Sequence, residues 1–371
     1  MKILFLPPSR TSPSARYRIL QFARPLRNLG NDVTVRVIRP ERDWQSPLRL
    51  RLPRLLHHRA ATIVRLGSAL AALRDLERFD VVFLNRDLVP EMRVRWLEPW
   101  LARRNPAVIF DFDDAIYLSS RHAKLRGIMP SFAAVTAGNE ILAGYARRWH
   151  SHVTVLPTVV DTGYYQPVEH RRPGPLRIGW TGSASPLRDY LPLVEAPIRS
   201  LASRYEFEFV VISNRPPAFV WPGVRLRFIP WSAATEAQDL QQIDIGLMPL
   251  REGPFEAAKC GTKAILHMAA GVPAIVSPVG VNQEIVVHGE TGFHCRTDAD
   301  WHKALETLLV DAALRRRMGE AGRDRAVRLY SQQQALPTLL ALFAEVAARR
   351  RLPAARQTGQ PAPQAHSKPA A

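Results

Sequence analysis

The stretch KCGTKAILHMAAGVPAIVSPVG, residues 259–280, decides the fold class of this chain. Its first half is an apolar segment with helical spacing that starts near Thr262 and ends at Gly-Val-Pro. A run of small and β-branched apolar residues follows at once, which is typical of a buried strand. Small residues allow the helix to pack closely on a sheet, so the stretch predicts a helix-to-strand unit of an α/β protein.

The same alternation of strand and helix occurs in both halves of the chain. MKILFL precedes a helical pattern that ends at Gly30, and the strand-like DVTVRVI follows. The order restarts at LRIGWTG (176–182), continues through a helical stretch near 187–204 and returns to a strand at FEFVVIS (207–213). Two β-α-β units of one plan predict two Rossmann-like, doubly wound domains.

Ligands of a doubly wound sheet bind beyond the carboxyl ends of its strands. In the second half, further strands are expected at VRLRFIP, DIGLMPL and PAIVSPV. A site is therefore expected at the loops that follow the strands of this half, which are residues 181–183, 230–231, 250–261 and 277–284.

The domain boundaries follow from composition. A Pro-, Gly- and charge-rich segment around residue 168 is typical of a linker, so we expect an N-terminal domain over 1–168 and a C-terminal domain over 169–335. Residues 336–352 are expected to form a C-terminal helix that can pack back on the N-terminal domain. Residues 353–371 are rich in Pro, Ala and Gln without periodic apolar positions, so we expect a disordered tail.

Charge limits the kinds of partner. The 371 residues include 51 Lys and Arg against 33 Asp and Glu, which leaves a net charge of +18. An acidic partner is therefore expected: a phosphorylated ligand, an anionic lipid or a nucleic acid. Arginines are dispersed along the chain without an aromatic-interleaved RNA motif or a zinc finger, so nucleic acid is the least favoured of the three.

The cysteines and the apolar segments suggest the compartment. Cys260 and Cys295 have no CxxC spacing and no histidines at zinc-ligand intervals, so neither a disulfide framework nor a metal site is expected. No stretch reaches the roughly 20 apolar residues of a membrane span. We expect a cytoplasmic protein, with peripheral contact to the cytoplasmic face of a membrane left open.

Two lysines flank the start of the helix predicted near Thr262. The free amides of a first helical turn and its positive dipole end favour an anion, and Lys259 and Lys263 add full charges there. Gly261 allows a ligand to approach the backbone closely. The pattern predicts a diphosphate site, while the alternative is that the two lysines simply solvate an exposed turn.

The sequence resembles the GT-B glycosyltransferases of family 4, the group 1 type. The blocks that carry the resemblance fall in that family's order and cover most of residues 1–335. They are DIGLMPL, KCGTKAILHMAAGVPAIVSPVGVNQEIV, GETGF, LRIGWTGSASPLRDYL, FIPWS, ARYRILQFARPLRNLGNDVTV, DVVFLNRDLVP, FDFDDAIY and AGNEILAGYA.

The resemblance implies two Rossmann-like domains facing across a deep cleft, with a nucleotide-sugar donor in the C-terminal domain and an acceptor held mainly by the N-terminal one. It also implies retention of anomeric configuration, with no bound metal and no cofactor. Carried over by position, it implies a set of donor-binding residues: Gly182, Ser183, Arg188, Trp231, Lys259, Gly261, Thr262, Lys263, Asn282 and Glu284.

One departure from the family's pattern concerns two glutamates separated by seven residues. Alignment on MAAGVP places them at Ala258 and Leu266, and neither is acidic. The chain instead resembles a branch with a KCG-x-K pattern, in which Lys259 and Lys263 compensate. Glu252 and Glu256 stand close enough in sequence to contact a sugar hydroxyl.

A group of carboxylates follows an apolar strand at FDFDDAIY. At least one of Asp111, Asp113 and Asp114 is expected to point into the interdomain cleft. There it could orient an acceptor hydroxyl or stabilise an oxocarbenium-like transition state, and we select Asp113 and Asp114, with Lys263, as the catalytic set. Two alternatives stay open: capping of the next helix, and a Mg²⁺ site, which the resemblance disfavours.

Three arginines follow strands of the N-terminal half. Arg16 and Arg18 lie at the loop-to-helix start after the first strand, and Arg86 follows another strand. The fixed fork of arginine suits phosphate or carboxylate, so all three are expected to bind the acceptor. A lipid-linked diphosphate would account for them, and a solvated basic surface is the alternative.

Residues 46–74 form a basic segment without acids. Arginines alternate with leucines there and Pro53 interrupts the pattern; they are Arg49, Arg51, Arg54, Arg59, Arg65 and Arg74. A basic amphipathic segment can lie on an anionic bilayer. The alternative is an ordinary helix that covers the N-terminal sheet.

The most favoured function is transfer of a sugar from a nucleotide-sugar to a hydroxyl acceptor, either lipid-linked or a polysaccharide intermediate of the cell envelope. The expected mechanism is front-face substitution, in which Lys259, Lys263 and the helix amides stabilise the departing diphosphate. Three alternatives stay open: a nucleotide-sugar epimerase on the same fold, a basic nucleic-acid-binding protein, and a catalytically inactive scaffold that lacks the two glutamates.

Overall fold

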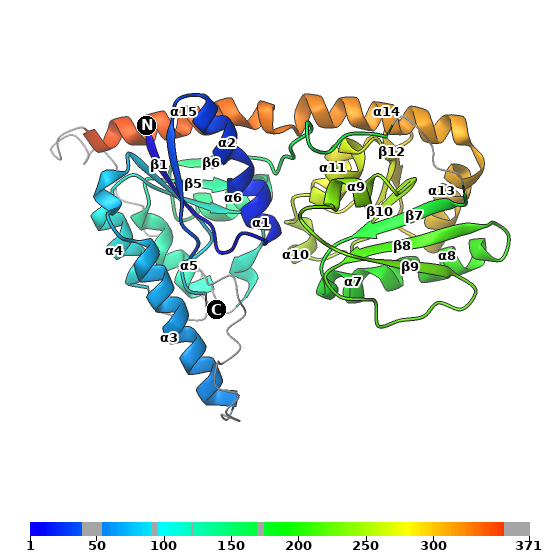
Figure 1. The fold of residues 1–371 in the computed structure, drawn as a ribbon, viewed down its shortest axis with the longest axis horizontal. Helices are drawn as coiled ribbons and strands as arrows, with labels where there is room; N and C mark the ends of the chain where they lie inside the picture. The colour runs from blue at the N-terminus through cyan, green and yellow to red at the C-terminus, as the bar shows by residue number, and fades with distance from the viewer. Residues whose placement is uncertain (39–53, 91–94, 120–121, 169–173, 352–371) are drawn as a thin grey trace, which may run out of the picture.

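The computed structural model describes residues 1–38, 54–90, 95–119, 122–168 and 174–351, and for residues 54–61 the backbone alone. Two α/β domains lie side by side (Figure 1). Each contains one six-stranded parallel sheet with helices against it. The two doubly wound domains predicted from the alternating pattern are therefore confirmed.

The N-terminal sheet has the strand order β2-β1-β3-β4-β5-β6. Its strands are β1 (Lys2–Leu6), β2 (Asp32–Val35), β3 (Val81–Asn85), β4 (Val108–Phe112), β5 (Ala134–Ala137) and β6 (Val153–Val155). Its helices are α1 (Pro13–Ala15), α2 (Gln21–Asn28), α3 (Arg54–Ala72), α4 (Leu97–Arg104), α5 (His122–Ile128) and α6 (Glu140–Arg147). Short turns are the π-helical η1 (Arg16–Leu20) and the 3₁₀ turns η2 (Leu76–Arg78), η3 (Ile116–Leu118) and η4 (Met129–Ser131).

The C-terminal sheet has the order β12-β11-β10-β7-β8-β9. Its strands are β7 (Leu176–Thr181), β8 (Phe207–Ser213), β9 (Arg225–Pro230), β10 (Ile245–Met248), β11 (Ala274–Val276) and β12 (Gly292–His294). Its helices are α7 (Ala184–Tyr190), α8 (Glu195–Ala202), α9 (Glu236–Leu240), α10 (Pro254–Ala257), α11 (Thr262–Ala269), α12 (Asn282–Ile285) and α13 (Asp298–Val310), with the 3₁₀ turn η5 (Leu191–Val194).

The strand order of each sheet reverses at one point, and ligands of doubly wound sheets bind there. In the N-terminal sheet the reversal lies between β1 and β3, which pair in parallel with Leu4 beside Val82. In the C-terminal sheet it lies between β7 and β10, with Ile178 beside Ile245. The strands on both sides of each reversal are buried, as the central strands of parallel sheets are.

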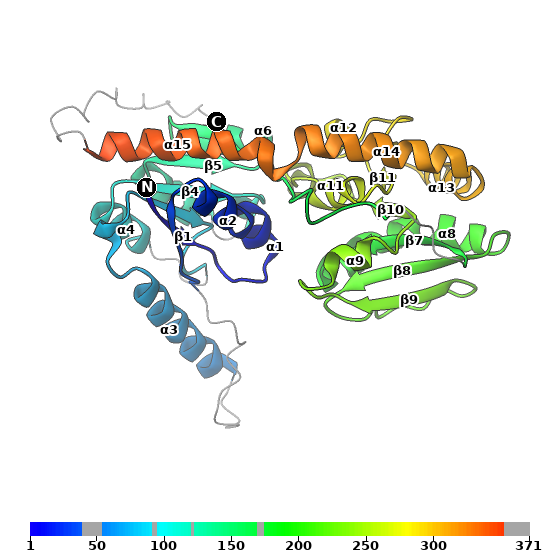
Figure 2. The ribbon, with the colours of Figure 1, turned by 45° about the horizontal axis from the view of Figure 1, so that its top comes forward.

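Two long helices join the domains. α14 (Ala312–Leu329) lies over the C-terminal domain, and α15 (Gln332–Arg351) continues over the N-terminal one (Figures 1 and 2). The ring of Phe343 packs edge-on against those of Phe5 and Phe83, with centroids 6.3 and 5.5 Å apart. The helix expected over 336–352 thus begins at Gln332 and completes the N-terminal core. The tail expected over 353–371 lies outside the described residues.

Candidate active site

The helix start predicted near Thr262 is the start of α11. Gly261 is its N-cap, with a φ of 65° in the left-handed region. A Cβ at this glycine would lie 2.0 Å from Ile285 Cδ1, so both conformation and space require glycine. No side chain caps the helix, which leaves its first-turn amides without a side-chain acceptor. These amides follow β10, at the reversal point of the C-terminal sheet.

The two lysines of the motif pack on aromatic rings. The Lys263 ammonium lies 5.5 Å from the centre of the Trp180 ring, and that of Lys259 lies 4.5 Å from Phe255 and 5.7 Å from Tyr190. Burial, and then the neighbouring charge of Lys259, lower the pKa of Lys263 to about 8. A lysine that only solvated an exposed turn would not be desolvated in this way. The pair instead concentrates positive charge at the start of α11.

Gly182 follows β7 and lies directly against Lys263. A Cβ there would approach Lys263 Cε to 2.8 Å and Trp180 Cη2 to 2.6 Å. The end of β7, the ring of Trp180 and the side chain of Lys263 therefore form one packed unit.

We expect Gly182→Ala to displace Lys263 from the Trp180 ring and to weaken nucleotide binding about 10-fold. The reason is steric, because neither the ring nor the lysine stem can move without disturbing the other. Binding of UDP, GDP and ADP, measured by calorimetry, checks this. Gly223→Ala is the matched control, because nothing lies within 4 Å of its Cβ position and its φ of 81° is also positive. An unchanged nucleotide affinity in Gly182→Ala would contradict the expectation.

Asp111 points back into the N-terminal domain. Its carboxylate accepts hydrogen bonds from Arg18 Nη2 at 2.5 Å, Asn85 Nδ2 at 2.8 Å and Thr136 Oγ1 at 2.7 Å. The Arg18 side chain is 1% exposed and also donates to the carbonyl of Leu156. Arg18 was predicted to bind the acceptor, but the structure places it in the core, where it compensates the charge of Asp111. Residues two apart on a helical turn point to opposite sides, so the turn η1 directs Arg16 and Arg18 to different partners.

Asp113 and Asp114 share one arginine. Arg86 Nη2 donates to Asp113 Oδ1 at 2.8 Å and to Asp114 Oδ2 at 2.6 Å, and Ser14 Oγ donates to Asp113 at 2.6 Å. Burial favours the neutral acid, but the charges of Arg86 and Arg18 outweigh it and lower the pKa of Asp113. Burial and the neighbouring charge of Asp113 raise the pKa of Asp114. One carboxylate is thereby kept ionised and the other is made a better proton acceptor.

Of the two alternatives for these aspartates, the structure bears on helix capping. The turn η3 that follows has no side-chain cap, since the carboxylates bond Arg86 and Ser14 instead. Within the described residues, no group of three or more His, Cys, Asp or Glu side chains could hold a metal ion. Asp114 is 31% exposed and acts electrostatically on Lys259 and Lys263. The structure thus brings Asp114 and Arg86 of one domain close to the lysines of the other.

The loop that carries Arg86 is strained and braced. Arg86 has a φ of 63°, which a side-chain-bearing residue adopts at a cost of about 1–3 kcal/mol. The next residue, Asp87, is held by an ion pair with buried Lys124 at 3.1 Å. Lys124 also pairs with Glu98 at 2.9 Å. Sequence reasoning missed this brace, because its members come from separate segments that no spacing relates.

Arg16 makes a contact between the domains. Its guanidinium pairs with Glu236 of α9 and lies 5.0 Å from the centre of the Trp231 ring. Glu236 also accepts hydrogen bonds from Tyr17 at 3.2 Å and from the Trp231 indole at 2.8 Å. Arg16 was predicted to bind the acceptor and Trp231 to bind the nucleotide-sugar donor. The structure places both in one interdomain cluster, and sequence reasoning missed Glu236.

The remaining predicted donor residues lie around the start of α11 and α7. Asn282 is buried, and its Oδ1 would be 3.2 Å from a Cβ at Gly261. Thr262 is half-buried, whereas Ser183 and Glu284 are exposed. Arg188 is 77% exposed and bonds its neighbour Asp189 at 3.0 Å, so it is held at the surface.

The carboxylates missing from the family's pattern have a structural explanation. Ala258 is fully buried against the N-terminal domain, and Leu266 is buried in the C-terminal core. An acid at either position would be desolvated without a partner. Glu256 accepts a hydrogen bond from Tyr190 at 2.7 Å, while Glu252 bonds Arg296 at 2.7 Å on the surface. Of the two, Glu256 lies nearer the lysines, because Tyr190 also contacts Lys259.

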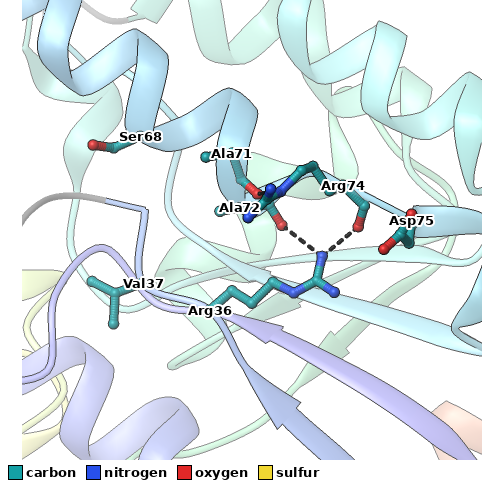
Figure 3. A pocket seen from close by; sticks show the side chains of 7 residues that line it. All are labelled: Arg36, Val37, Ser68, Ala71, Ala72, Arg74 and Asp75. Carbon is teal, nitrogen blue, oxygen red and sulfur yellow. Dashed lines mark hydrogen bonds between the residues drawn. The ribbon is translucent and has the colours of Figure 1, made fainter.

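A hollow of about 680 Å³ lies elsewhere, between the end of β2 and the end of α3 (Figure 3). Arg36 Nη1 donates to the carbonyl of Ala72 at 3.2 Å and to that of Arg74. The arginine therefore caps the helix end, and its charge is used there. None of the residues placed around α11 lines this hollow: its lining is Arg36, Val37, Ser68, Ala71, Ala72, Arg74 and Asp75.

Helix α3 projects from the body of the N-terminal domain (Figures 1 and 2). Two large apolar side chains on it face solvent, Ile63 at 70% and Leu70 at 42% exposure. Within the described residues, no helix is both long enough and apolar enough to pass through a bilayer. Of the basic segment 46–74, residues 46–53 lie outside the described residues.

Comparison with solved structures shows the fold of the protein. A glycosyltransferase from Rickettsia africae aligns with a TM-score of 0.68 at 14% identity, covering 93% of this chain and 98% of that one. Sucrose-phosphate synthase from Thermosynechococcus elongatus aligns at 0.66 and 15% identity, covering 94% and 100%. HepE from Anabaena, solved in complex with UDP, aligns at 0.66 and 14%, covering 93% and 100%. These identities show the fold, and the chain is a GT-B protein.

One segment of the sequence matches a known family model. Residues 226–325 match the model of the family described as glycosyl transferases group 1, from β9 into α14. The matched segment, which includes α11 and both lysines, is therefore similar to group 1 glycosyltransferases. A search of curated protein sequences finds no match.

Proposed function

We propose that this chain transfers a sugar from a nucleotide-sugar to a hydroxyl acceptor, with retention of configuration and without a metal ion. The observation that carries the proposal is the arrangement around α11. Its uncapped amides, Lys259 and Lys263 offer positive charge from the C-terminal domain, and Asp114 with Arg86 faces them from the N-terminal domain. A diphosphate bound by the first group would place its sugar between the two.

In this proposal the bond from the anomeric carbon to the diphosphate oxygen breaks while the acceptor oxygen attacks from the same face. The developing charge on the diphosphate is stabilised by Lys263, Lys259 and the amides of α11. The proton of the acceptor passes to the leaving phosphate oxygen or to Asp114, whose raised pKa suits an acceptor of protons. Asp113 stays ionised and holds Arg86 in place.

The donor is tested by thermal unfolding of the full chain with UDP-, GDP-, ADP- and TDP-sugars at millimolar concentration. A true donor at 100 times its Kd stabilises the fold by about 2.7 kcal/mol, a clear rise in Tm. Solved neighbours favour UDP and ADP compounds for the first trials, since HepE was solved with UDP-glucose and starch synthase IV from Arabidopsis thaliana with ADP and acarbose. No stabilisation by any nucleotide-sugar would overturn the proposal.

We further propose a lipid-linked or cell-envelope acceptor that the enzyme meets at the cytoplasmic face of a membrane. Support comes from the net charge of +18 and from the projecting helix α3, whose Ile63 and Leu70 are exposed beside a basic sequence. Apolar residues could enter a bilayer interface while arginines meet anionic headgroups.

Binding to vesicles should depend on anionic lipid and on the arginines of residues 46–74. Vesicles containing 30% phosphatidylglycerol are expected to bind the chain at least ~10-fold better than vesicles of phosphatidylcholine. Co-sedimentation of the chain with the vesicles measures this difference. Neutralising the six arginines to glutamine should abolish this difference. Neutralising six exposed arginines of the C-terminal half is the matched control for net charge: Arg199, Arg204, Arg225, Arg316, Arg317 and Arg328. Equal binding by both variants would show that total charge, and not this segment, is responsible.

A further inference from the structure

The loop before α11 is buried in the other domain. Ala258 and Cys260 belong in sequence to the C-terminal domain, yet they pack in the hydrophobic cluster of the N-terminal domain, with Phe112 and Ala137. Ala258 is fully buried and Cys260 is 8% exposed. Between them stands Lys259. We call residues 258–260 the plug, because this segment inserts into the N-terminal domain.

The plug is held by named polar contacts. Asn139 Nδ2 donates to the carbonyl of Ala258 at 2.8 Å and to that of Lys259 at 3.3 Å. The Cys260 thiol donates to the carbonyl of Asp113 at 3.2 Å. Asn139 itself is fixed, since its Oδ1 caps α6 by accepting from the amide of Leu142 at 3.0 Å. One rigid helix start therefore holds the plug.

Gly138 makes the room for this contact. A Cβ at Gly138 would lie 2.3 Å from Cys260 Sγ, much closer than van der Waals contact allows. Its other near neighbours are Asp113 Cα at 3.3 Å and Cβ at 3.5 Å. Gly138 has no positive φ, so glycine is required here for space and not for backbone conformation.

We infer that Gly138, Asn139 and Cys260 are positioning residues, which set Lys259 of the donor side against Asp113 and Asp114 of the acceptor side. The inference rests on the proposed function. Lys259 is anchored through the residues on both of its sides, and Asp113 is anchored through its own carbonyl. If the contacts of the plug with Gly138 and Asn139 are lost, Lys263 stays at the start of α11. Lys259 on the donor side then moves away from Asp113 and Asp114 on the acceptor side.

Thiol labelling tests the contact between the plug and the N-terminal domain, and it needs no donor. In the full chain, N-ethylmaleimide modification of Cys260 and Cys295 is followed by peptide mass spectrometry. Cys295 is the internal control, because it is buried in the core of the C-terminal domain and away from the plug. Gly138→Ala is expected to speed labelling of Cys260 at least ~10-fold while Cys295 stays protected. Equal acceleration of both thiols would mean general unfolding, and no acceleration would mean that the plug is not seated; either result overturns the inference.

A second variant keeps the inference testable if Gly138→Ala fails to fold. Asn139→Asp keeps the side-chain acceptor that caps α6 but loses the amide donor to the plug. It should also expose Cys260 selectively. Protection of Cys260 equal to that in the wild type would contradict a role for Asn139.

The kinetic test uses size complementation. Gly138→Ala should lower kcat about 10- to 100-fold at saturating donor, with a smaller change in donor KM, because misplaced reacting groups reduce turnover more than binding. Adding Cys260→Ala removes the atom in the clash and should restore part of kcat, while the loss of the thiol hydrogen bond to Asp113 keeps kcat below that of the wild type. Adding Cys260→Ser keeps an atom there and should not. A double variant Gly138→Ala/Cys260→Ala no better than Gly138→Ala would sink the inference. If no donor turns over at all, the proposed function fails, and the labelling result still stands by itself.

Discussion

Lys263→Ala is expected to lower turnover by about 10²- to 10³-fold and to remove the thermal stabilisation given by a nucleotide-sugar. The Lys263 ammonium is half-buried against Trp180, beside the uncapped amides of α11. A charge held in a partly desolvated site stabilises a developing anion far more than one in water, and loss of a comparable group elsewhere costs ~3–4 kcal/mol. Steady-state kinetics and thermal unfolding with donor measure both effects.

The control for this substitution is Lys303→Ala, which removes an exposed lysine from α13 of the same domain. It should leave turnover and donor stabilisation unchanged, because a surface charge far from a ligand is screened by salt. A Lys263→Ala protein that still binds and turns over donor like the Lys303→Ala protein would contradict the diphosphate site at α11.

The titration of Lys263 adds a pH test with a definite sign. Burial and the charge of Lys259 bring its pKa down to about 8, so in the free protein the ammonium is lost as pH rises through this value. A bound diphosphate favours the charged form, so binding is coupled to proton uptake above pH 8. Donor affinity should therefore fall above pH 8. Lys263→Arg, charged throughout this range, should show a flat profile up to pH 10, and a flat wild-type profile would refute the assignment.

Asp111→Ala is expected to destabilise the N-terminal domain by about 3–5 kcal/mol. The substitution would leave the Arg18 guanidinium buried without its counter-charge, and Asn85 and Thr136 without their shared acceptor. An unpaired buried charge costs more than the pair contributes, so loss of one partner is worse than loss of both. Urea unfolding followed by circular dichroism measures the change in the free energy of unfolding.

Two comparisons separate burial of charge from a general effect of losing a carboxylate. Asp189→Ala removes a surface carboxylate that pairs with exposed Arg188 and Ser185, and it should change stability by less than about 0.5 kcal/mol. Asp111→Leu with Arg18→Met should recover part of the loss by replacing the ion pair with apolar packing. If Asp111→Ala proved as mild as Asp189→Ala, the buried pair would have no structural role.

Much of the fold could be predicted because its signals are local. The helical spacing of α11, the glycine at its start and the Gly-Val-Pro before β11 all lie within one short segment. Repetition of the β-α-β pattern then predicted two doubly wound domains, and strand ends predicted where ligands bind. Gly182 and Lys263 lie side by side, as the reversal of strand order between β7 and β10 requires.

The roles of the charged residues depended on contacts that spacing cannot express. Asp111, Asp113 and Asp114 are nearly adjacent, but one is buried with Arg18 and the other two face Arg86. Arg16 and Arg18 are separated by a single residue, yet a π-helical turn directs one to Glu236 and the other to Asp111. Partners so distant along the chain could be matched only once both sheets were assembled.

By itself the sequence determined the class of fold, the cationic start of α11 and the two-domain plan, because periodicity and turn residues act over a few neighbouring positions. Tertiary structure alone decided which cationic side chains can contact a ligand and which are paired with carboxylates inside the protein. It also decided that Cys260 sits against Gly138 of the other domain. The physical reason is that burial and pairing of charges depend on atoms brought together by folding, and their energies change with every neighbour that excludes water.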